Sequence, residues 1–396
     1  MKVLLVLTYY HPHVSGLTIY VQRLATALAQ RGHQVTVLTS RYDPALRAEE
    51  EIDGVRVVRA PVLFRVSKGV IMPSFPLLAW RLIREHDVVS VHLPQFEASL
   101  LALLGRLVGR PVVLTYHCDL QLPKGWFNRI VDKVVFVSNY LAGHLAQAAV
   151  AYTQDFAEHS HFLSRFLPKV QVIPPPVIMP TPEPEAVEAF RAAHDLAGRP
   201  VVGMAARLAT EKGVEVLIEA MPRLLEVLPR LKVLFGGQYE DVMGEEAYYQ
   251  RLMPMIEQLG AEHWEFLGML TQAQMPAFFA ACDVLVVPSL NSTESFGLVQ
   301  VEAMLCGTPS IASNLPGVRQ PPRMTGMGEV TPIGDSEALA RAILRILQHP
   351  DDYVRPRRLI EDAFSLERTV SGYEALFEAL EAGQTQVSQP AKVPET

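Results

Sequence analysis

Cysteine is scarce in this sequence of 396 residues, which contains only Cys118, Cys282 and Cys306. The three residues lie far apart, with no Cys-x-x-Cys pair and no histidine at metal-ligating spacing. This arrangement argues against a disulfide framework and against a zinc site. It is typical of a protein that works in a reducing compartment, so we expect a cytoplasmic location.

Long hydrophobic runs are also missing. The longest stretches without charge, such as 70–80, are much shorter than the ~20 residues that a membrane-spanning helix needs. The opening apolar run, 3–7, is too short for a signal peptide and is typical of a buried strand. We therefore expect a soluble protein that lies in the cytoplasm or rests against the inner face of the membrane.

Charged residues form only 19% of the chain and hydrophobic residues form 49%, a composition that excludes disorder for all but the ends. The net charge of −7 argues against binding to nucleic acid. This charge is unevenly distributed. Residues 1–170 contain 18 Lys and Arg against 12 Asp and Glu, whereas the rest of the chain contains 17 against 30. The chain thus has a basic first part and an acidic second part.

Several common motifs are absent. No Gly-x-Gly-x-x-Gly follows the first strand, which argues against a dinucleotide cofactor. There is no Walker A sequence, no His-Glu-x-x-His and no Gly-x-Ser-x-Gly. An Asp-x-Asp pair, which could hold a metal against a sugar-nucleotide diphosphate, is missing as well. We therefore expect no cofactor and no metal, and an anionic ligand neutralised by Arg, Lys and backbone amides.

Short β-branched runs alternate with longer amphipathic stretches, a pattern that predicts an α/β fold of two doubly wound, Rossmann-like domains facing each other across a cleft. The predicted first domain covers 1–173 and the second covers 185–364. Between them, six prolines within 174–184 predict a linker. A last amphipathic helix over 365–382 is expected to pack back toward the first domain, and 383–396 to be disordered.

Two adjacent predictions in the first domain depend on local propensity alone. The run 133–137 contains three valines and a phenylalanine and predicts a strand. The segment 139–149 is predicted to be a helix.

The first candidate site is the segment 294–302, ESFGLVQVE, which follows a predicted strand and opens a helix. The amides of Ser295, Phe296 and Gly297 are expected to be free at the helix start, where they would bind an anion. Glu294 and Glu302 lie eight residues apart, about 12 Å along a helix, so one could bind sugar hydroxyls and the other a ribose. Alternatively, Glu302 is a solvated helix residue and Glu294 only complements the helix dipole.

The second candidate site follows the predicted strand 201–205. Arg207 and Lys212 lie in the strand-to-helix loop, where a guanidinium and an ammonium would suit a diphosphate. Alternatively, these charges pair with Glu211 or lie in water. Gly236 and Gly237 end another predicted strand and offer either a close approach to a ligand or an ordinary turn.

Taken together, these motifs resemble the family 4 retaining glycosyltransferases of the GT-B fold, the glycosyl transferases group 1. The resemblance covers the chain to about residue 382, in both halves. It rests on Arg207, Lys212-Gly213, Gly236-Gly237, Gly268, Glu294-Ser295-Phe296-Gly297, Glu302-Ala303 and Gly307-Thr308-Pro309, and on Tyr10-His11-Pro12, Ser15-Gly16, Val21 to Ala25, Leu28 and Arg31 to Val37.

The resemblance implies a role for each matching residue. Arg207 and Lys212 would hold the donor diphosphate, Glu294 the transferred sugar and Glu302 the ribose. His117 would lie beside the reacting sugar carbon, or is merely a strand-end histidine bonded to a carbonyl. The remaining donor contacts would come from Gly16, Gly237, Met269, Leu270, Ser295, Phe296, Gly297 and Leu298.

Two departures from the family pattern put the donor's identity in question. The usual glycine pair of the first loop is Ser15-Gly16 here, and the turn after 309–312 lacks its common acidic residue. The resemblance implies metal-independent transfer of a hexose from a UDP- or GDP-sugar to an acceptor hydroxyl, with retained configuration. The alternatives are a nucleotide-sugar epimerase of the same fold and a non-catalytic protein that binds a sugar nucleotide.

The acceptor is expected to be a growing glycan or a lipid-linked molecule of cell envelope biosynthesis. The apolar and basic segment 64–81 suggests a first domain that contacts an anionic membrane peripherally. Alternatively, the apolar residues of this segment belong to the core.

Overall fold

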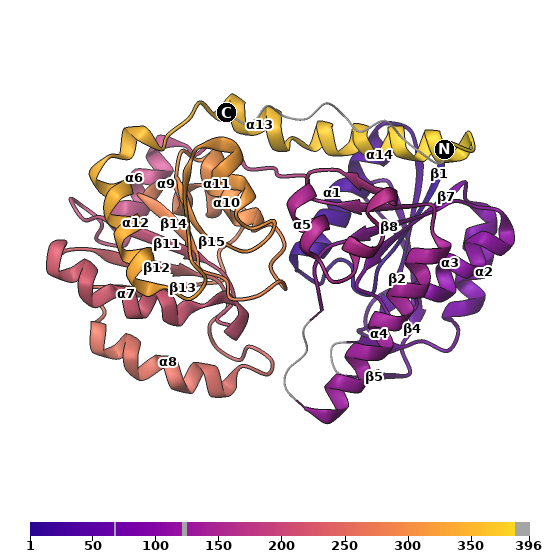
Figure 1. Cartoon of the computed structure of the whole chain (residues 1–396), viewed down its shortest axis with the longest axis horizontal. Coiled ribbons are helices and arrows are strands. Elements are labelled where there is room, and N and C mark those ends of the chain that lie inside the picture. Colours follow the sequence, from indigo (N-terminus) through magenta and orange to yellow (C-terminus); the bar gives the residue numbers. More distant parts are fainter. Residues whose placement is uncertain (67–68, 121–124, 385–396) are drawn as a thin grey trace. The chain divides into compact units, whose positions relative to one another are not determined.

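The computed structural model describes residues 1–66, 69–120 and 125–384. The chain divides into two compact units (Figure 1). Unit 1 comprises Met1–Pro176 and the segment that begins at Ser365, and unit 2 comprises Val177–Phe364. Each unit is a mainly parallel sheet with helices on its faces, so the predicted α/β fold with two doubly wound domains is confirmed. The tail that the sequence predicts to be disordered, 383–396, lies mostly outside the described residues.

Unit 1 contains an eight-stranded sheet of order β10-β9-β8-β7-β1-β2-β4-β3, in which only β3 runs antiparallel to its neighbour. The strands β5 and β6 pair antiparallel in a separate two-stranded sheet. The strands are β1 (Lys2–Val6), β2 (Gln34–Arg41), β3 (Glu49–Ile52), β4 (Val55–Pro61), β5 (Phe64–Val66), β6 (Gly69–Ile71), β7 (Val88–Leu93), β8 (Val112–Tyr116), β9 (Ala148–Ala151) and β10 (Val170–Val172). The α-helices are α1 (Gly16–Gln30), α2 (Phe75–Glu85), α3 (Ala98–Val108), α4 (Trp126–Leu145), α5 (Gln154–His159) and α14 (Leu366–Glu381).

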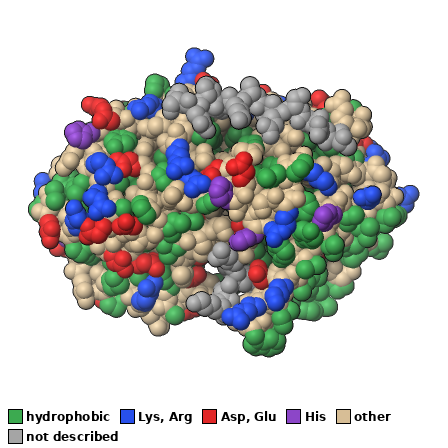
Figure 2. All heavy atoms as spheres, in the orientation of Figure 1, with side chains coloured by type: hydrophobic (Ala, Val, Ile, Leu, Met, Phe, Trp, Pro, Cys, Tyr) green, Lys and Arg blue, Asp and Glu red, His purple; other side chains and the backbone are tan. Residues whose placement is uncertain are grey.

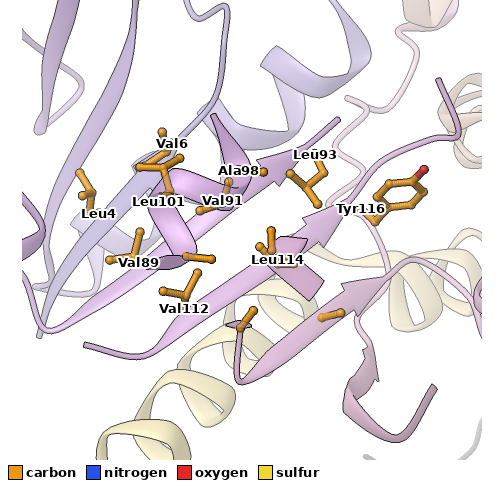
Figure 3. Close-up of a cluster of buried hydrophobic side chains, with 14 of the residues drawn as sticks. Leu4, Val6, Val89, Val91, Leu93, Ala98, Leu101, Val112, Leu114 and Tyr116 are labelled. Atoms are coloured by element: carbon orange, nitrogen blue, oxygen red, sulfur yellow. The ribbon is translucent and has the colours of Figure 1, made fainter. Parts of the chain in front are cut away.

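One face of this sheet packs against α2, α3 and α4. Alternate residues of β1, β7 and β8, among them Leu4, Val89 and Leu114, meet Ala98 and Leu101 of α3 in a buried cluster (Figure 3). Because successive side chains of a strand point to opposite faces, Val3 and Leu5 face the other layer, to which α1 and α14 belong. The central strands are therefore buried on both faces, as their continuous apolar sequences predict.

Unit 2 contains a six-stranded parallel sheet of order β13-β12-β11-β14-β15-β16. One face packs against α7, α8 and α12. The strands are β11 (Val201–Ala205), β12 (Lys232–Gly236), β13 (Trp264–Gly268), β14 (Val284–Val287), β15 (Ser310–Ser313) and β16 (Gly328–Thr331). The α-helices are α6 (Pro184–Ala193), α7 (Val214–Val227), α8 (Glu246–Leu259), α9 (Met275–Ala281), α10 (Leu298–Leu305), α11 (Gln320–Thr325), α12 (Ser336–Gln348) and α13 (Arg357–Phe364).

The proline-rich segment has no regular structure from 173 to 183, and its start is attached to unit 1. Arg23 of α1 donates to the carbonyl of Pro176 at 2.9 Å, and Thr369 of α14 donates to that of Pro174 at 2.8 Å. The helix α14 thus belongs to unit 1, although it follows all of unit 2 in the sequence.

Two predicted elements of unit 1 are wrong. The strand expected over 133–137 lies inside helix α4, and the helix expected over 139–149 stops at Leu145, before strand β9. The valines and Phe136 have strand propensity, but propensity is a weak local preference that the surroundings override. Here the segment belongs to a helix whose second half packs against α3, and the small residues Ala148–Ala151 form the strand because they are buried between β8 and β10.

Candidate functional site

The candidate site of unit 2 lies where its strand order reverses. Strands β11 and β14 are neighbours, and the chain proceeds from them toward opposite edges of the sheet. The loops that follow these two strands lie at the carboxyl edge beside this reversal point, the usual ligand position in such sheets. Both loops carry predicted site residues: Arg207 and Lys212 follow β11, and Glu294 follows β14.

The two loops are held together by backbone contacts. The Leu290 amide donates to the Glu211 carbonyl at 2.9 Å. Gly213 ends the first loop with φ = 65°, and a Cβ at this position would lie 2.2 Å from the Pro288 carbonyl oxygen. Only glycine permits this approach without displacing the backbone. The glycine next to Lys212 thus lets its loop reach the one that carries Glu294.

This contact brings Lys212 and Glu294 together. The Lys212 Nζ lies 2.6 Å from Glu294 Oε2, and the two side chains are 22% and 18% exposed. Burial by itself raises the pKa of the Glu294 carboxyl, but the Lys212 ammonium and the amides of Gly297 and Phe296 outweigh it and hold the pKa below its ordinary value. Glu294 is therefore a carboxylate that can accept hydrogen bonds from hydroxyl groups.

The prediction that the amides after Glu294 are free is wrong for Phe296 and Gly297. The Gly297 amide donates to Glu294 Oε1 at 2.9 Å, and the Phe296 amide also bonds to this carboxylate. The carboxylate folds back over the helix start because the first amides of a helix have no partner within it. Helix α10 itself begins at Leu298, after Gly297 in a left-handed conformation. An anion at these amides would have to share them with Glu294.

Arg207 is the more exposed of the two predicted cations, since half of its side chain is accessible to solvent. Its Nη2 lies 3.0 Å from Glu211 Oε1, which is the pairing considered as an alternative to diphosphate binding. An exposed pair of this kind is weak, so the guanidinium can exchange this carboxylate for a ligand phosphate at little cost.

Three further predicted donor residues border the same edge. Gly237 follows β12, with its amide bonded to the Gly268 carbonyl at 2.8 Å, and a Cβ on it would lie 2.0 Å from the Ala206 carbonyl oxygen. This glycine is thus required by the protein's own neighbouring loop. Met269 is exposed after β13, and Leu270 is half-buried.

The segment after Glu294 has mixed roles. Ser295 is buried, and the Phe296 ring is buried against Phe364, so the ring belongs to the core and only the backbone of Phe296 can reach a ligand. Leu298 and Glu302 are half-buried on α10.

Gln300, which the sequence reasoning missed, fixes this segment from behind. Its fully buried amide donates to the carbonyls of Phe296 and Val318 and accepts from Ser310 Oγ at 3.0 Å. The available signal was a glutamine between two valines, Val299 and Val301, in a mostly apolar helix.

In unit 1, His117 follows strand β8 and is only 5% exposed. Its Nε2 lies 2.9 Å from Nδ1 of His92 in the neighbouring strand β7, and its Nδ1 bonds to the Tyr152 hydroxyl. Burial, with a smaller effect of His92, holds the pKa of His117 well below its ordinary value, and burial lowers that of His92 to about 3. Both rings are therefore neutral, because a buried imidazolium would be poorly solvated.

The histidine pair belongs to a larger buried polar cluster. The Tyr20 ring of α1 meets His117 edge-on at 4.9 Å between centroids, and its hydroxyl bonds to that of Tyr373 on α14 at 2.8 Å. Thr115 bonds to the same Tyr373 hydroxyl at 2.8 Å. Gly16, the other predicted site residue of unit 1, is exposed at the first position of α1, where Ser15 caps the helix by accepting from the Thr18 amide.

Two negative findings apply to the described ranges. Within 1–66, 69–120 and 125–384, no group of three His, Cys, Asp or Glu is arranged to hold a metal ion. Over the same ranges, every helix is too short or too polar to cross a membrane.

Two family models match this chain. Residues 187–364 match the model described as glycosyl transferases group 1, and residues 15–176 match the glycosyl transferase 4-like domain. These two segments correspond closely to units 2 and 1.

Similar proteins include curated enzymes and solved structures. The 2-deoxystreptamine N-acetyl-D-glucosaminyltransferase of Streptomyces fradiae is 31% identical, over 83% of this chain and 82% of that protein. The GDP-mannose-dependent alpha-(1-6)-phosphatidylinositol monomannoside mannosyltransferase of Mycolicibacterium smegmatis is 29% identical, over 88% and 89%. Anabaena HepE in complex with UDP-glucose superimposes with a TM-score of 0.76 at 22% identity, covering 96% of this chain and 100% of that one. At this identity, the likeness to HepE concerns the fold alone.

Proposed function

This chain belongs to the family 4, group 1 glycosyltransferases, and on that premise we propose that it transfers a hexose from a UDP- or GDP-sugar to an acceptor hydroxyl with retained anomeric configuration and without a metal. The observation that carries this proposal is the Lys212–Glu294 pair, which joins a cation and a carboxylate at the reversal point of the unit 2 sheet. A cation suits the diphosphate, and a carboxylate beside it suits the hydroxyls of the attached sugar.

The proposed chemistry follows from these charges. As the bond between the sugar and the diphosphate breaks, negative charge grows on the leaving oxygen, and Lys212 and Arg207 stabilise it. That oxygen then accepts the proton of the acceptor hydroxyl, which attacks from the same face of the sugar. Glu294 orients the sugar ring through its hydroxyls, and Glu302 on α10 is proposed to bind the ribose.

His117 is proposed to lie beside the sugar carbon at which positive charge develops. A charged imidazolium there would oppose that charge, whereas the neutral ring that burial maintains does not. The bonds from His92 and Tyr152 hold the ring in one orientation. The proposal thus gives the buried histidine cluster a function that depends on its neutrality.

For the acceptor, we propose a lipid-linked molecule or a growing glycan of the cell envelope. The name of the mycobacterial relative specifies a phosphatidylinositol mannoside as its acceptor, which supports a lipid-linked class. The Streptomyces relative acts on 2-deoxystreptamine, so a small polar acceptor is the competing possibility. Peripheral contact of unit 1 with the cytoplasmic face of the membrane belongs to this proposal.

The deciding experiment has two stages. First, UDP-, GDP- and ADP-sugars are compared by thermal shift, since a ligand that binds the folded state raises the melting temperature. Then the stabilising donor is incubated with lipid and glycan acceptors, and the product's anomeric configuration is read by NMR. Transfer with retention in the presence of EDTA is the expected result. Conversion of the donor without an acceptor would instead indicate an epimerase.

A further inference from the structure

Helix α4 carries an apolar stripe on its exposed side. Trp126, Ile130, Val134, Val137 and Leu141 recur at spacings of three and four residues, and each is between 44% and 76% exposed. At 3.6 residues per turn, this spacing places the five side chains along one side of the helix, over about 22 Å. We refer to these five residues as the α4 stripe.

The rest of α4 explains why the stripe faces outward. The buried residues of the helix lie in its second half only, where Ser138 accepts from the Ser99 amide at 3.1 Å and Gly143 lies against the Phe166 ring. Between Trp126 and Val137, no residue is buried. In Figure 1, this first half of α4 extends beyond the strands of unit 1. An apolar helix that only half belongs to the core presents a surface that water solvates poorly.

Basic residues border the α4 stripe. At about 100° per residue, Lys133 lies next to Trp126 and Val137 around the helix, and Arg129 follows it, whereas Asp132 lies on the opposite side. Across α2, α3 and α4 together, the five cations Arg81, Arg84, Arg106, Arg129 and Lys133 stand against only Glu85 and Asp132. Figure 2 shows hydrophobic and Lys or Arg side chains together over this region.

The apolar surface is wider than one helix. Leu103 and Leu107 are exposed on α3, and Leu77 and Trp80 on α2, in the same layer as α4. By contrast, α1 and α14 of the other layer, both described in full, expose no large hydrophobic side chain. A single partner helix would cover one groove of such a layer, whereas a lipid surface can cover all three helices.

From this combination, we propose that the outer face of α2, α3 and α4 docks on an anionic lipid bilayer, with the α4 stripe inserted at the level of the head groups. Exposed Trp and aliphatic side chains with flanking Lys and Arg are the composition of surface-bound amphipathic helices. The proposal rests on the proposed function for its purpose, since docking would bring unit 1 to a lipid-linked acceptor. It differs from the sequence expectation by placing α4, rather than 64–81, at the centre of the contact.

The test measures co-sedimentation of the full chain with vesicles of phosphatidylcholine alone or mixed with phosphatidylinositol. We expect binding to the mixed vesicles that weakens at high salt. Trp126→Gln, Ile130→Gln and Val137→Gln combined should weaken it by about tenfold or more, since three apolar side chains leave the lipid. Arg129→Gln with Lys133→Gln should weaken it by about tenfold at low salt. Val227→Gln with Met243→Gln, at similarly exposed positions of unit 2, is the matched control and should bind like the wild type.

Three results would overturn the proposal. The first is wild-type protein that stays in the supernatant, and the second is a stripe variant that binds vesicles like the wild type. The third is a wild-type protein that binds no vesicles but forms an oligomer, while the stripe variant is a monomer. The last result would make this face a protein interface. Glutamine is a good helix former, and the unchanged melting temperature of each variant verifies folding. Thermal shift with sugar nucleotides, measured without lipid, reports on the proposed function separately, because the stripe variants should keep it.

Discussion

The two units place polar groups at the carboxyl edges of similar sheets, but these groups differ in burial and in charge. In unit 2, Lys212 and Glu294 meet at the edge as a charged, partly exposed pair. In unit 1, His92 and His117 are buried and neutral, and their hydrogen bonds are made to each other and to Tyr152. The difference shows that sheet topology selects where functional groups gather, while the depth of burial selects their charge. A charged edge suits a diphosphate, and a neutral one suits a carbon that becomes positive.

The largest effect is expected at the charged edge. Lys212→Ala should lower turnover by about 10²–10³-fold, because a preorganised cation on the leaving group is removed. The free energy of unfolding should fall by only about 1 kcal/mol, since the Lys212–Glu294 pair is partly exposed. Steady-state kinetics and thermal unfolding measure the two quantities.

Arg223→Ala is the control for this change, because Arg223 pairs with Glu337 on the surface of the same unit and neither residue belongs to the site loops. It should leave turnover unchanged. Equal turnover of Lys212→Ala and the wild type would show that the Lys212–Glu294 pair takes no part in the reaction.

The next effect concerns the loop contact that creates the charged edge. Gly213→Ala forces a Cβ against the Pro288 carbonyl at positive φ, so the free energy of unfolding should fall by about 3 kcal/mol. Gly307→Ala has a similar φ of 88° with no atom within 4 Å of the added Cβ and should cost about 1–2 kcal/mol. Urea unfolding compares them. If both variants lose the same stability, the close approach is not a constraint.

The buried histidines of unit 1, His92 and His117, predict a dependence of stability on pH. The folded-state pKa values of His92 and His117 lie below the unfolded value of about 6.5, so the unfolded state takes up protons first as the pH falls. Stability should therefore decline below pH ~6.5, by up to about 1.4 kcal/mol per pH unit for each histidine. The lowered pKa of Glu294 acts later: its contribution is lost only as the pH falls through that folded-state value.

Hydrogen exchange corrected for the intrinsic rate can follow β7 and β8 separately from β11 and β14 between pH 7 and pH 5. We expect protection to decrease first in unit 1. His92→Asn should reduce this decrease, whereas His159→Gln, at an exposed position, should not alter it. Loss of protection in unit 2 first would contradict the assignment of neutral histidines to unit 1.

The smallest effect is expected at Met269, which is exposed after β13. A donor contact made by the backbone of Met269 does not depend on the side chain, so Met269→Ala should change KM by less than about twofold, as for most exposed substitutions. Donor titration of initial rates measures this value. A larger change would mean that the Met269 side chain itself packs on the donor.

Much of this organisation could be predicted from the sequence. Alternating apolar runs indicated two doubly wound domains, and the loops with Arg207, Lys212 and Glu294 could be placed at strand ends. The Lys212–Glu294 contact could not, because it depends on the pairing of β11 with β14, strands about 80 residues apart in the chain. The partners of His117 were missed for the same reason, since Tyr20, His92 and Tyr152 come from three distant parts of the chain.

The α4 region shows the limit most clearly. The sequence determined which side chains are apolar and which are basic, and local propensity over 133–137 favoured a strand. Only tertiary structure decided that these residues form a helix, that half of it packs on α3, and that the α4 stripe remains exposed. The physical reason is that burial is a property of neighbours: apolar residues lower the free energy only where other elements exclude water from them, and the sequence of one segment does not contain those elements.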